Sequence, residues 1–246
     1  YVASIIERVE EQPVVDFKPF KALRFTVTQG EELSNFICPP YDIISEQEQS
    51  HLYSLSEFNA VRLELPVLDM NSLEEQYKTV RTKLSQWLNN NTLTRDSSDS
   101  FYISRHQFSY NGKSYNRYGI TGCIRLGGSS NNGIITHEHT APKPRHDRLV
   151  HVQYSQANIS PIMGLYRDSN LILTDLMQRV AQEAPCSQVK LSADEEIVLW
   201  KTDEPKDLSL IQSYFEHCKV HLADGHHRYG AMLQYQQIAQ ETQIQA

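Results

Sequence analysis

Five consecutive residues near the end of the chain have the types and the spacing of an anion-binding turn. They are Asp224, Gly225, His226, His227 and Arg228, and they lie between a short apolar run and a helical pattern. A strand, a tight turn and a helix are therefore predicted in that order. The first turn of a helix leaves backbone N–H groups free and carries the positive end of the peptide dipoles, so it attracts anions. The sequence predicts a phosphate site at this turn.

The side chains of the turn strengthen that prediction in different ways. Arg228 supplies a planar fork of donors that matches phosphate oxygens, and His226 and His227 can donate hydrogen bonds or carry protons near neutral pH. Gly225 lets the backbone turn tightly and approach a ligand closely. A plainer interpretation is that Asp224 caps the helix while the histidines lie on a surface turn. The uninterrupted run of five favours the anion site.

A second charged cluster, earlier in the chain, supplies candidate catalytic groups. His137, Glu138 and Thr140 follow a pair of isoleucines that is expected to form a short strand. The zinc motif H-E-x-x-H is absent, because the residue four positions after His137 is Ala141. This spacing does not support a helical metal site, and a hydrolase or metal enzyme that uses the histidines as ligands is the least favoured function.

The segment after this cluster is predicted to be a loop. Pro142 and Pro144 argue against a helix; Lys143 lies between them and Arg148 follows. A polar loop of this kind is suited to the wall of an active site. Composition alone, however, favours an exposed charged loop in which Asp147 and Arg148 pair with neighbouring residues.

The elements that must position these residues alternate between helices and strands. Two capping boxes and a helical apolar face predict helices, Asn111-Gly112 predicts a β-hairpin, and alternating polarity predicts a half-buried strand at 59–65. The expected helices lie near 45–55, 72–89, 170–183 and 206–217, and the expected strands near 17–28, 59–65, 101–110, 113–126, 134–135, 162–166, 189, 197–201 and 220–223. An α/β or α+β mixed sheet with flanking helices is predicted, without a defined topology.

Bulk properties limit the classes of partner. The chain has 246 residues, of which 39% are hydrophobic and 22% charged, which is typical of a folded globular region. A net charge of -7 predicts no nucleic-acid or membrane partner, and no apolar run approaches membrane-spanning length. The cysteines show no C-x-x-C pair, so a reducing cytoplasm is expected. A Gly, Ser and Asn-rich stretch at 127–133 is a candidate internal hinge in a single α/β region spanning 1–246.

Several short stretches, taken as a set, resemble one protein family. They are Pro39-Pro40-Tyr41-Asp42, Asn59-Ala60-Val61-Arg62-Leu63-Glu64, Arg117-Tyr118-Gly119, His137-Glu138-His139-Thr140, Asp147-Arg148-Leu149, Asn158-Ile159-Ser160-Pro161-Ile162 and Ala223-Asp224-Gly225-His226-His227-Arg228-Tyr229. Their order is similar to that of an uncharacterised bacterial and archaeal family, the domain of unknown function catalogued as ten-fifteen. The resemblance runs from about Phe17 to the end. It implies that these motifs share a pocket, and that the chain is part of a longer protein whose C-terminal part is missing.

The Asp-Gly-His-His-Arg core is also similar to that of free-serine kinases with a ParB/sulfiredoxin-like fold. This second resemblance implies a phosphotransferase that uses Mg²⁺ with a nucleotide or polyphosphate donor and a small hydroxyl acceptor, specifically free serine. Glu138, with His137, is expected to orient or deprotonate the hydroxyl group. The phosphate groups are expected to contact Arg148 and Thr140 as well as the His-His-Arg turn. Asp224 is the candidate metal ligand.

Other interpretations stay open at this point. A non-catalytic sensor of a nucleotide or a phosphorylated metabolite would use the same turn. Asp42 is expected to cap the helix that follows it rather than to face a metal. Arg62 is expected either to bind an anion or to lie in solvent. A small molecule is the expected ligand, and the oligomeric state is open.

Overall fold

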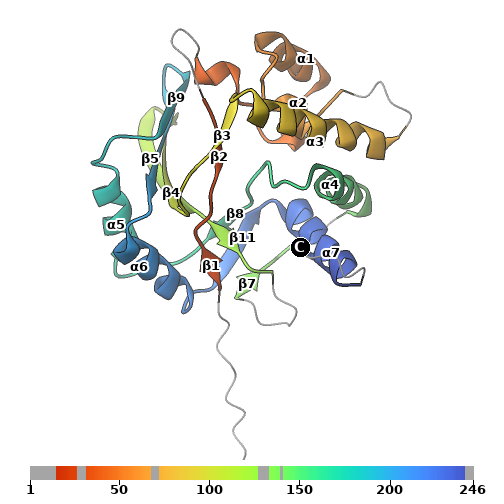
Figure 1. Cartoon of the computed structure of the whole chain (residues 1–246). Coiled ribbons are helices and arrows are strands. Elements are labelled where there is room, and N and C mark those ends of the chain that lie inside the picture. The colour runs from red at the N-terminus through yellow and green to blue at the C-terminus, as the bar shows by residue number, and fades with distance from the viewer. Residues whose placement is uncertain (1–14, 27–31, 68–71, 127–132, 139–140, 242–246) are drawn as a thin grey trace, which may run out of the picture.

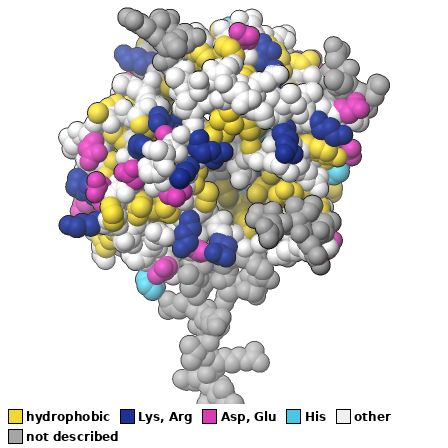
Figure 2. Space-filling view, in the orientation of Figure 1, with side chains coloured by type: hydrophobic (Ala, Val, Ile, Leu, Met, Phe, Trp, Pro, Cys, Tyr) yellow, Lys and Arg dark blue, Asp and Glu magenta, His cyan; other side chains and the backbone are white. Residues whose placement is uncertain are grey.

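The computed structural model describes residues 15–26, 32–67, 72–126, 133–138 and 141–241 (Figure 1). These ranges contain seven α-helices, two 3-10 helices and eleven strands, and the strands form four small sheets. The mixed α/β fold that the sequence predicts is therefore confirmed. Figure 2 shows Lys and Arg side chains intermixed with Asp and Glu on one face of the molecule.

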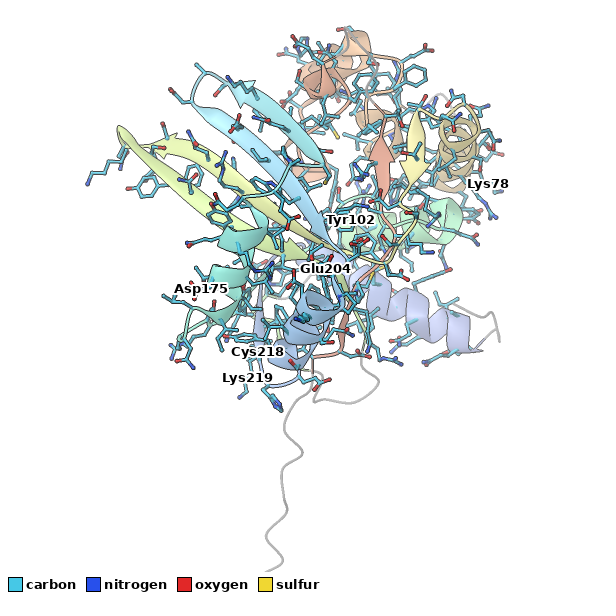
Figure 3. All side chains as sticks on the ribbon, turned by 60° about the vertical axis from the view of Figure 1, so that its left-hand side comes forward. Lys78, Tyr102, Asp175, Glu204, Cys218 and Lys219 are labelled. Atoms are coloured by element: carbon cyan, nitrogen blue, oxygen red, sulfur yellow. The ribbon has the colours of Figure 1, made fainter. Side chains whose placement is uncertain are left out.

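The largest sheet is antiparallel and has the strand order β5-β4-β10-β9. Its strands are β4 (Phe101–Tyr110), β5 (Lys113–Thr121), β9 (Ser187–Ser192) and β10 (Glu195–Thr202). Figure 3 shows the four strands as one twisted layer at the side of the molecule. This layer supplies one wall of the first hydrophobic core.

The hairpin that joins β4 to β5 confirms its prediction. Asn111 and Gly112 have φ angles of 50° and 72°, and Tyr110 pairs with Lys113 on either side of them. Both central residues need positive φ in a type I′ turn, which Asn and Gly accept most readily. The local sequence therefore determines the register of this pair of strands.

Two helices cover the large sheet and complete the first core. They are α5 (Ile172–Val180) and α6 (Pro205–Phe215), close to the predicted ranges. The buried residues of this core are Val15, Phe17, Phe101, Ile103, Leu173, Leu176, Met177, Val180, Val198, Trp200, Ile211, Phe215 and Val220. Val220 begins the signature strand, so this core anchors one end of the strand that leads into the candidate site.

A second core lies among the helices on the other side of the molecule. It holds α2 (Val61–Glu64) and α3 (Leu73–Asn89) close to β2 (Leu23–Phe25) and β3 (Leu93–Arg95), and α1 (Glu46–Leu55) contacts α2. The buried residues of this core are Leu63, Tyr77, Val80, Trp87, Leu93 and Val150. The side chains of Ser45 and Ser72 accept hydrogen bonds from the N–H groups three residues later, so both predicted capping boxes form their N-caps.

The remaining elements outside the third sheet are short. They are β1 (Phe17–Lys18), which pairs with β6 (Cys123–Ile124), and the 3-10 helices η1 (Leu33–Asn35) and η2 (Tyr41–Ile43). In the described ranges, no helix is both long enough and apolar enough to cross a membrane.

The third sheet carries the signature strand. Its order is β7-β11-β8, with β7 (Ile134–Ile135) parallel and β8 (Met163–Leu165) antiparallel to β11 (Val220–Asp224). Helix α7 (His226–Glu241) follows β11 and packs against α4 (Pro142–Ser155), as Figure 1 shows. The strand-turn-helix predicted at 220–235 is therefore present, although the helix begins at His226 rather than near Tyr229.

The strand predicted at 59–65 is wrong, because these residues form the single turn α2. The Oδ1 of Asn59 accepts a hydrogen bond from the N–H of Val61 at 2.9 Å, which caps the turn. The Nδ2 of Asn59 also donates to the carbonyl oxygens of Asn35 and Ile37. Arg62 lies over the ring of Tyr53 and donates to backbone carbonyls, so its contacts are structural.

The loop predicted after the His-Glu cluster is also wrong, because α4 begins there at Pro142. Ala141 is the N-cap, so Pro142 and Pro144 both lie in the first turn. The N–H groups of a first turn have no partner within the helix, and a proline there loses no hydrogen bond. The prolines mark the start of the helix instead of excluding it.

Two smaller predictions have different outcomes. Ser45 caps α1 with a bond from the N–H of Glu48 at 3.2 Å, whereas Asp42 is exposed in η2, so the predicted capping role of Asp42 is wrong. The candidate hinge at 127–133 lies outside the described residues except for Gly133, whose φ is 71°.

Candidate functional site

Three segments meet at one edge of the β7-β11-β8 sheet. Because β7 and β11 are parallel, the chain leaves both strands at the same edge, and the antiparallel β8 begins there. The edge therefore collects residues 137–138, 158–162 and 225–228. Ligands of open α/β sheets often bind beyond the carboxyl ends of parallel strands. The topology thus explains how motifs that are distant in sequence form one site.

The turn between β11 and α7 depends on Gly225. Its φ is 88°, and a Cβ atom at this position would lie 2.8 Å from Cγ2 of Ile162 and 3.2 Å from Nε of Arg228. The positive φ and the close approach of Ile162 together require glycine. The turn is closed at its base by the N–H of Tyr229, which donates to the carbonyl of Gly225 at 2.9 Å.

The first turn of α7 has backbone donors that the helix itself does not use. Because the helix begins at His226, the N–H groups of His226, His227 and Arg228 have no helical carbonyl to which they can donate. The same end of the helix carries the positive end of its dipole. The predicted anion-attracting geometry is thus present in the backbone.

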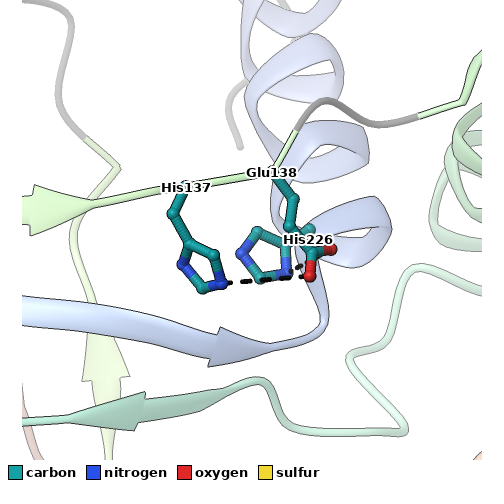
Figure 4. Close-up of side chains that lie close together, drawn as sticks. All are labelled: His137, Glu138 and His226. Atoms are coloured by element: carbon teal, nitrogen blue, oxygen red, sulfur yellow. Dashed lines mark ion pairs between the residues drawn. The ribbon is translucent and has the colours of Figure 1, made fainter.

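Side chains from the segment after β7 and from α7 form a compact cluster at this edge, which we call the His-Glu-His cluster (Figure 4). It consists of His137, Glu138 and His226. Oε2 of Glu138 lies 3.3 Å from Nδ1 of His226, and Oε1 lies 3.8 Å from Nε2 of His137. The rings of the two histidines meet edge to face, 4.7 Å apart. Both predicted catalytic residues therefore contact the signature turn.

The cluster combines exposed and buried groups. The side chain of His226 is only 6% exposed, whereas those of His137 and Glu138 are 60% and 61% exposed. Two nitrogens, Nε2 of His226 and Nδ1 of His227, are buried without a hydrogen-bond partner among the described residues. Buried polar atoms without partners are uncommon and are enriched where a ligand, a water or an ion completes the site.

Arg228 is held in place by its own turn. Its Nη2 donates to Oδ2 of Asp224 at 2.7 Å, and its Nη1 donates to the carbonyl of Pro161. A guanidinium group has five N–H donors, so these two bonds leave three for a ligand.

Residues three and four positions apart share one helix face, but His226 and Arg228 are about 200° apart around the axis of α7. They therefore flank the first turn on opposite sides.

Arg148, predicted to bind phosphate, instead lies in a buried network. Its guanidinium donates to Asp147, Tyr77 and both the carbonyl and the carboxylate of Glu64, at distances from 2.7 to 3.4 Å. These five contacts use all five donors. The ring of Tyr41 stacks on the guanidinium, with its centre 3.9 Å away. The predicted phosphate role of Arg148 is therefore replaced by a structural one.

The charges of this network set the protonation of its members. Burial alone lowers the pKa of Arg148, but Tyr77 and Asp147 more than offset it and raise that pKa above its usual range. Burial and the charge of Arg148 lower the pKa of His151, whose Nε2 donates to the carbonyl of Leu63 at 2.9 Å. Arg148 is thus charged and His151 is neutral near pH 7.

A small cavity separates the network from α7. Its volume is about 40 Å³, and Glu64, Arg148, His151 and Arg228 contribute to its lining. Oε2 of Glu64 is buried without a hydrogen-bond partner among the described residues. A water needs roughly 10–15 Å³, so the cavity has room for a few waters but not for a nucleotide base.

The other predicted site residues lie in varied positions. Asp224, the candidate metal ligand, pairs with Arg228 and lies outside the His-Glu-His cluster, so its metal role is not supported by the geometry. Thr140 lies outside the described residues. Lys143 and His146 are exposed on α4.

The sequence interpretation missed three residues of the buried network. Glu64 was predicted to lie on a strand, Tyr77 on a helical apolar face, and His151 was not singled out. Arg148, His151 and Ser155 are buried and recur every three or four residues along α4. Polar residues at the spacing of an apolar face are the signal that could have revealed them.

Comparison with known proteins identifies the family. The model of the family described as "Protein of unknown function (DUF1015)" matches residues 17–246. No curated protein and no solved structure matches the chain, so the kinase similarity and the ParB/sulfiredoxin-like fold stay predictions. The family match covers most of the chain and includes every motif described above. The chain therefore belongs to the DUF1015 family.

Proposed function

We propose that this protein transfers a phosphoryl group from a nucleotide or polyphosphate donor to a small hydroxyl compound. The observation that carries the proposal is the position of Glu138. Its exposed carboxylate lies 3.3 Å from Nδ1 of His226, at the open first turn of α7. This distance supports a site in which a carboxylate that can act on a hydroxyl group lies beside the proposed anion-binding turn.

The first turn of α7 would hold the donor phosphates. Their oxygens would accept hydrogen bonds from the N–H groups of His226, His227 and Arg228 and from the remaining donors of Arg228. The side chain of Arg228 is already held by its 2.7 Å bond to Asp224. It therefore loses little conformational freedom when a phosphate binds. Because the nearby cavity is about 40 Å³, the base of a nucleotide donor would lie on the surface outside it.

The reaction asks for positioning more than for covalent chemistry by the protein. The acceptor oxygen forms a bond to phosphorus while the bond from phosphorus to the leaving phosphate oxygen breaks. The hydroxyl proton goes to Glu138, directly or through a water. Mg²⁺ bound to the donor would neutralise charge on the phosphate oxygens.

A non-catalytic sensor of the same ligands is the second candidate. The hydrogen bonds of two arginines favour the sensor. Arg148 has all its donors occupied, and Arg228 already donates to Asp224 and Pro161. A transferring phosphoryl group needs preorganised positive charge with donors that are not already occupied, and of these two arginines only Arg228 keeps such donors. Binding and turnover must therefore be measured separately.

Binding is tested by calorimetric titration of the protein with pyrophosphate, ADP and ATP, with and without Mg²⁺. We expect one phosphate ligand to bind and Arg228→Ala to weaken it about tenfold, the effect of one lost charge-assisted hydrogen bond. Lys219→Ala, which removes an exposed positive charge just before β11, is the control and should bind normally. No binding of any of the three ligands by the unaltered protein would overturn the proposal.

Turnover is tested with the donor that binds, and free serine is the first acceptor to assay. We expect Glu138→Gln to keep binding but to lower the rate of transfer by a factor of about 10²–10⁴. Glu216→Gln, an exposed change at the end of α6, should have no effect. Binding without transfer to serine or to a panel of other small hydroxyl compounds would establish the sensor instead.

A further inference from the structure

The His-Glu-His cluster has the composition of a metal site as well as that of an acid-base site. Its three members offer one carboxylate oxygen and two imidazole nitrogens, and these ligand atoms all lie within 4.8 Å of one another. They come from two segments, the residues just after β7 and the first residue of α7, which are far apart in sequence. Figure 4 shows the three side chains converging on one point.

The distances suit a tetrahedral ion. Ligand atoms about 2.0–2.2 Å from a zinc ion lie about 3.4 Å from each other. The Nδ1 of His226 and Oε2 of Glu138 are already 3.3 Å apart, whereas the Nε2 of His137 is 3.8 Å from the other oxygen of Glu138, Oε1, so one of these side chains must rotate before a single oxygen faces both imidazoles. The side chains of His137 and Glu138 are mostly exposed, so small rotations bring them to ligand distance without disturbing the core.

The choice of ligand atoms limits the choice of metal. Mg²⁺ and Ca²⁺ prefer oxygen ligands, whereas imidazole nitrogen suits first-row transition metals. Two imidazoles and one carboxylate match the three protein ligands of catalytic zinc sites, which leave a position open for water or substrate. The exposure of His137 and Glu138 places that open position toward solvent.

The burial of His226 is a second observation that points to a ligand at this residue. His226 is buried, and its Nε2 has no hydrogen-bond partner among the described residues. Packing alone does not explain an imidazole in this position, because a buried polar atom without a partner costs roughly 1–3 kcal/mol. A metal bond at Nδ1 would leave the proton on Nε2 and would not satisfy that atom itself, but the energy of the bond would offset the cost of burying the ring.

We propose that His137, Glu138 and His226 bind one divalent transition-metal ion of the Mn²⁺ to Zn²⁺ series. The inference deepens the proposed function and rests on it for the role of the ion: one oxygen of Glu138 would bind the metal, and its other oxygen would take the proton of the acceptor hydroxyl, directly or through a water. Metal binding itself requires no phosphoryl transfer, so the two ideas fail separately.

The positive charges around the cluster predict that metal binding and phosphate binding are coupled. The positive end of the α7 dipole and Arg228 oppose a bare cation, whereas an anion at the first turn offsets them. Phosphate should therefore raise the affinity for the metal, and by linkage the metal should raise the affinity for phosphate by the same factor.

The test is a titration of the chelator-stripped protein with Zn²⁺, Mn²⁺ and Mg²⁺, in competition with a chromogenic chelator, and with Co²⁺ followed by its visible absorption. We expect one Zn²⁺ or Co²⁺ per chain and weaker Mg²⁺ binding. His137→Gln and Glu138→Gln, both at exposed positions, should each weaken binding at least tenfold and remove the tetrahedral Co²⁺ spectrum. His146→Gln, at an exposed histidine outside the cluster, is the matched control.

Equal binding by all variants, or no transition-metal binding by the unaltered protein, would overturn the inference. His226→Gln is informative only with an unfolding curve, because His226 is buried, and the exposed variants carry the test. A metal bound by these residues in a protein that transfers no phosphoryl group would refute the proposed function but not the site. Transfer supported by Mg²⁺ in a protein that binds no transition metal would refute the site but not the function.

Discussion

The guanidinium carbon of Arg148 lies 3.9 Å from the centre of the Tyr41 ring, with Glu64 and Tyr77 completing its surroundings. This contact joins the Pro-Pro-Tyr-Asp stretch to α4. It places three of the family-like motifs around one buried cation, next to the first turn of α7. The motifs at 39–42, 59–64 and 147–149 are therefore best explained as a support for the site rather than as ligand contacts.

Replacing Arg148 should unfold the protein more easily. In Arg148→Met the carboxylate of Glu64, which is 2% exposed, loses its positive partner, and the expected loss of stability is about 3–5 kcal/mol. Urea unfolding measures it. Lys143→Met, an exposed change on the same helix, is the control, and Arg148→Met combined with Glu64→Met should recover part of the loss. An Arg148→Met protein that is as stable as the control would contradict the structural role.

The glycine at the signature turn should not tolerate a side chain. Gly225→Ala combines a φ of 88° with a Cβ atom 2.8 Å from Ile162, so we expect a loss of about 2–4 kcal/mol. Gly112→Ala is the matched control, because φ is 72° there but no atom lies within 4 Å of the added Cβ. The control should lose only about 1 kcal/mol of backbone strain. Equal losses in thermal unfolding would show that Ile162 moves aside freely.

The pair formed by Arg24 and Asp96 should make stability depend on acid. Arg24, followed by Tyr102, holds the pKa of Asp96 below its usual range through hydrogen bonds, the shortest of which is 2.6 Å. A carboxylate with a lowered folded-state pKa contributes stability above its unfolded pKa of about 3.9, and the contribution is lost as pH falls through the folded value. Arg24→Gln should cost about 2 kcal/mol at pH 7. The difference from the unaltered protein should shrink in unfolding curves recorded below about pH 4.

His151 should make a second, milder contribution to pH dependence. Its folded-state pKa is lowered by burial and by Arg148, so the unfolded chain binds the proton more readily. Stability should therefore fall as pH drops below about 6.5, the usual pKa of histidine. His151→Gln keeps a donor for the carbonyl of Leu63 but cannot titrate, and it should flatten the stability curve between pH 7 and pH 5. A curve of unchanged slope would assign the dependence to another group.

The sequence predicts well those elements whose structure depends on a few neighbouring residues. The capping serines Ser45 and Ser72, the Asn111-Gly112 turn and the glycine at 225 each determine their structure within a few residues. The failures have local causes too. Alternating polarity over six residues cannot distinguish a strand from the single turn α2, and the prolines at the start of α4 were interpreted as helix breakers although they lie in a first turn.

The candidate site could be predicted only in part. The open start of α7 follows from the sequence around His226, and the nearness of Glu138 was expected only from a family resemblance. The spacing of residues could not show that Glu138 and His226 touch, because that contact depends on the parallel pairing of β7 with β11. The full engagement of Arg148 depends on α3 and α2, whose packing no local pattern specifies.

The parallel pairing of β7 with β11 also has a kinetic consequence. Helix α7 and its turn can form from neighbouring residues, but the His-Glu-His cluster exists only after a long intervening segment, including α4, α5 and the β9-β10 pair, has been closed into place. Contacts that close long loops form late, because the entropy of closure is lost before the contacts compensate for it. No partly folded intermediate that lacks this pairing can hold the complete site. Competence to bind a ligand there should therefore return last during refolding, after most of the helical signal has recovered.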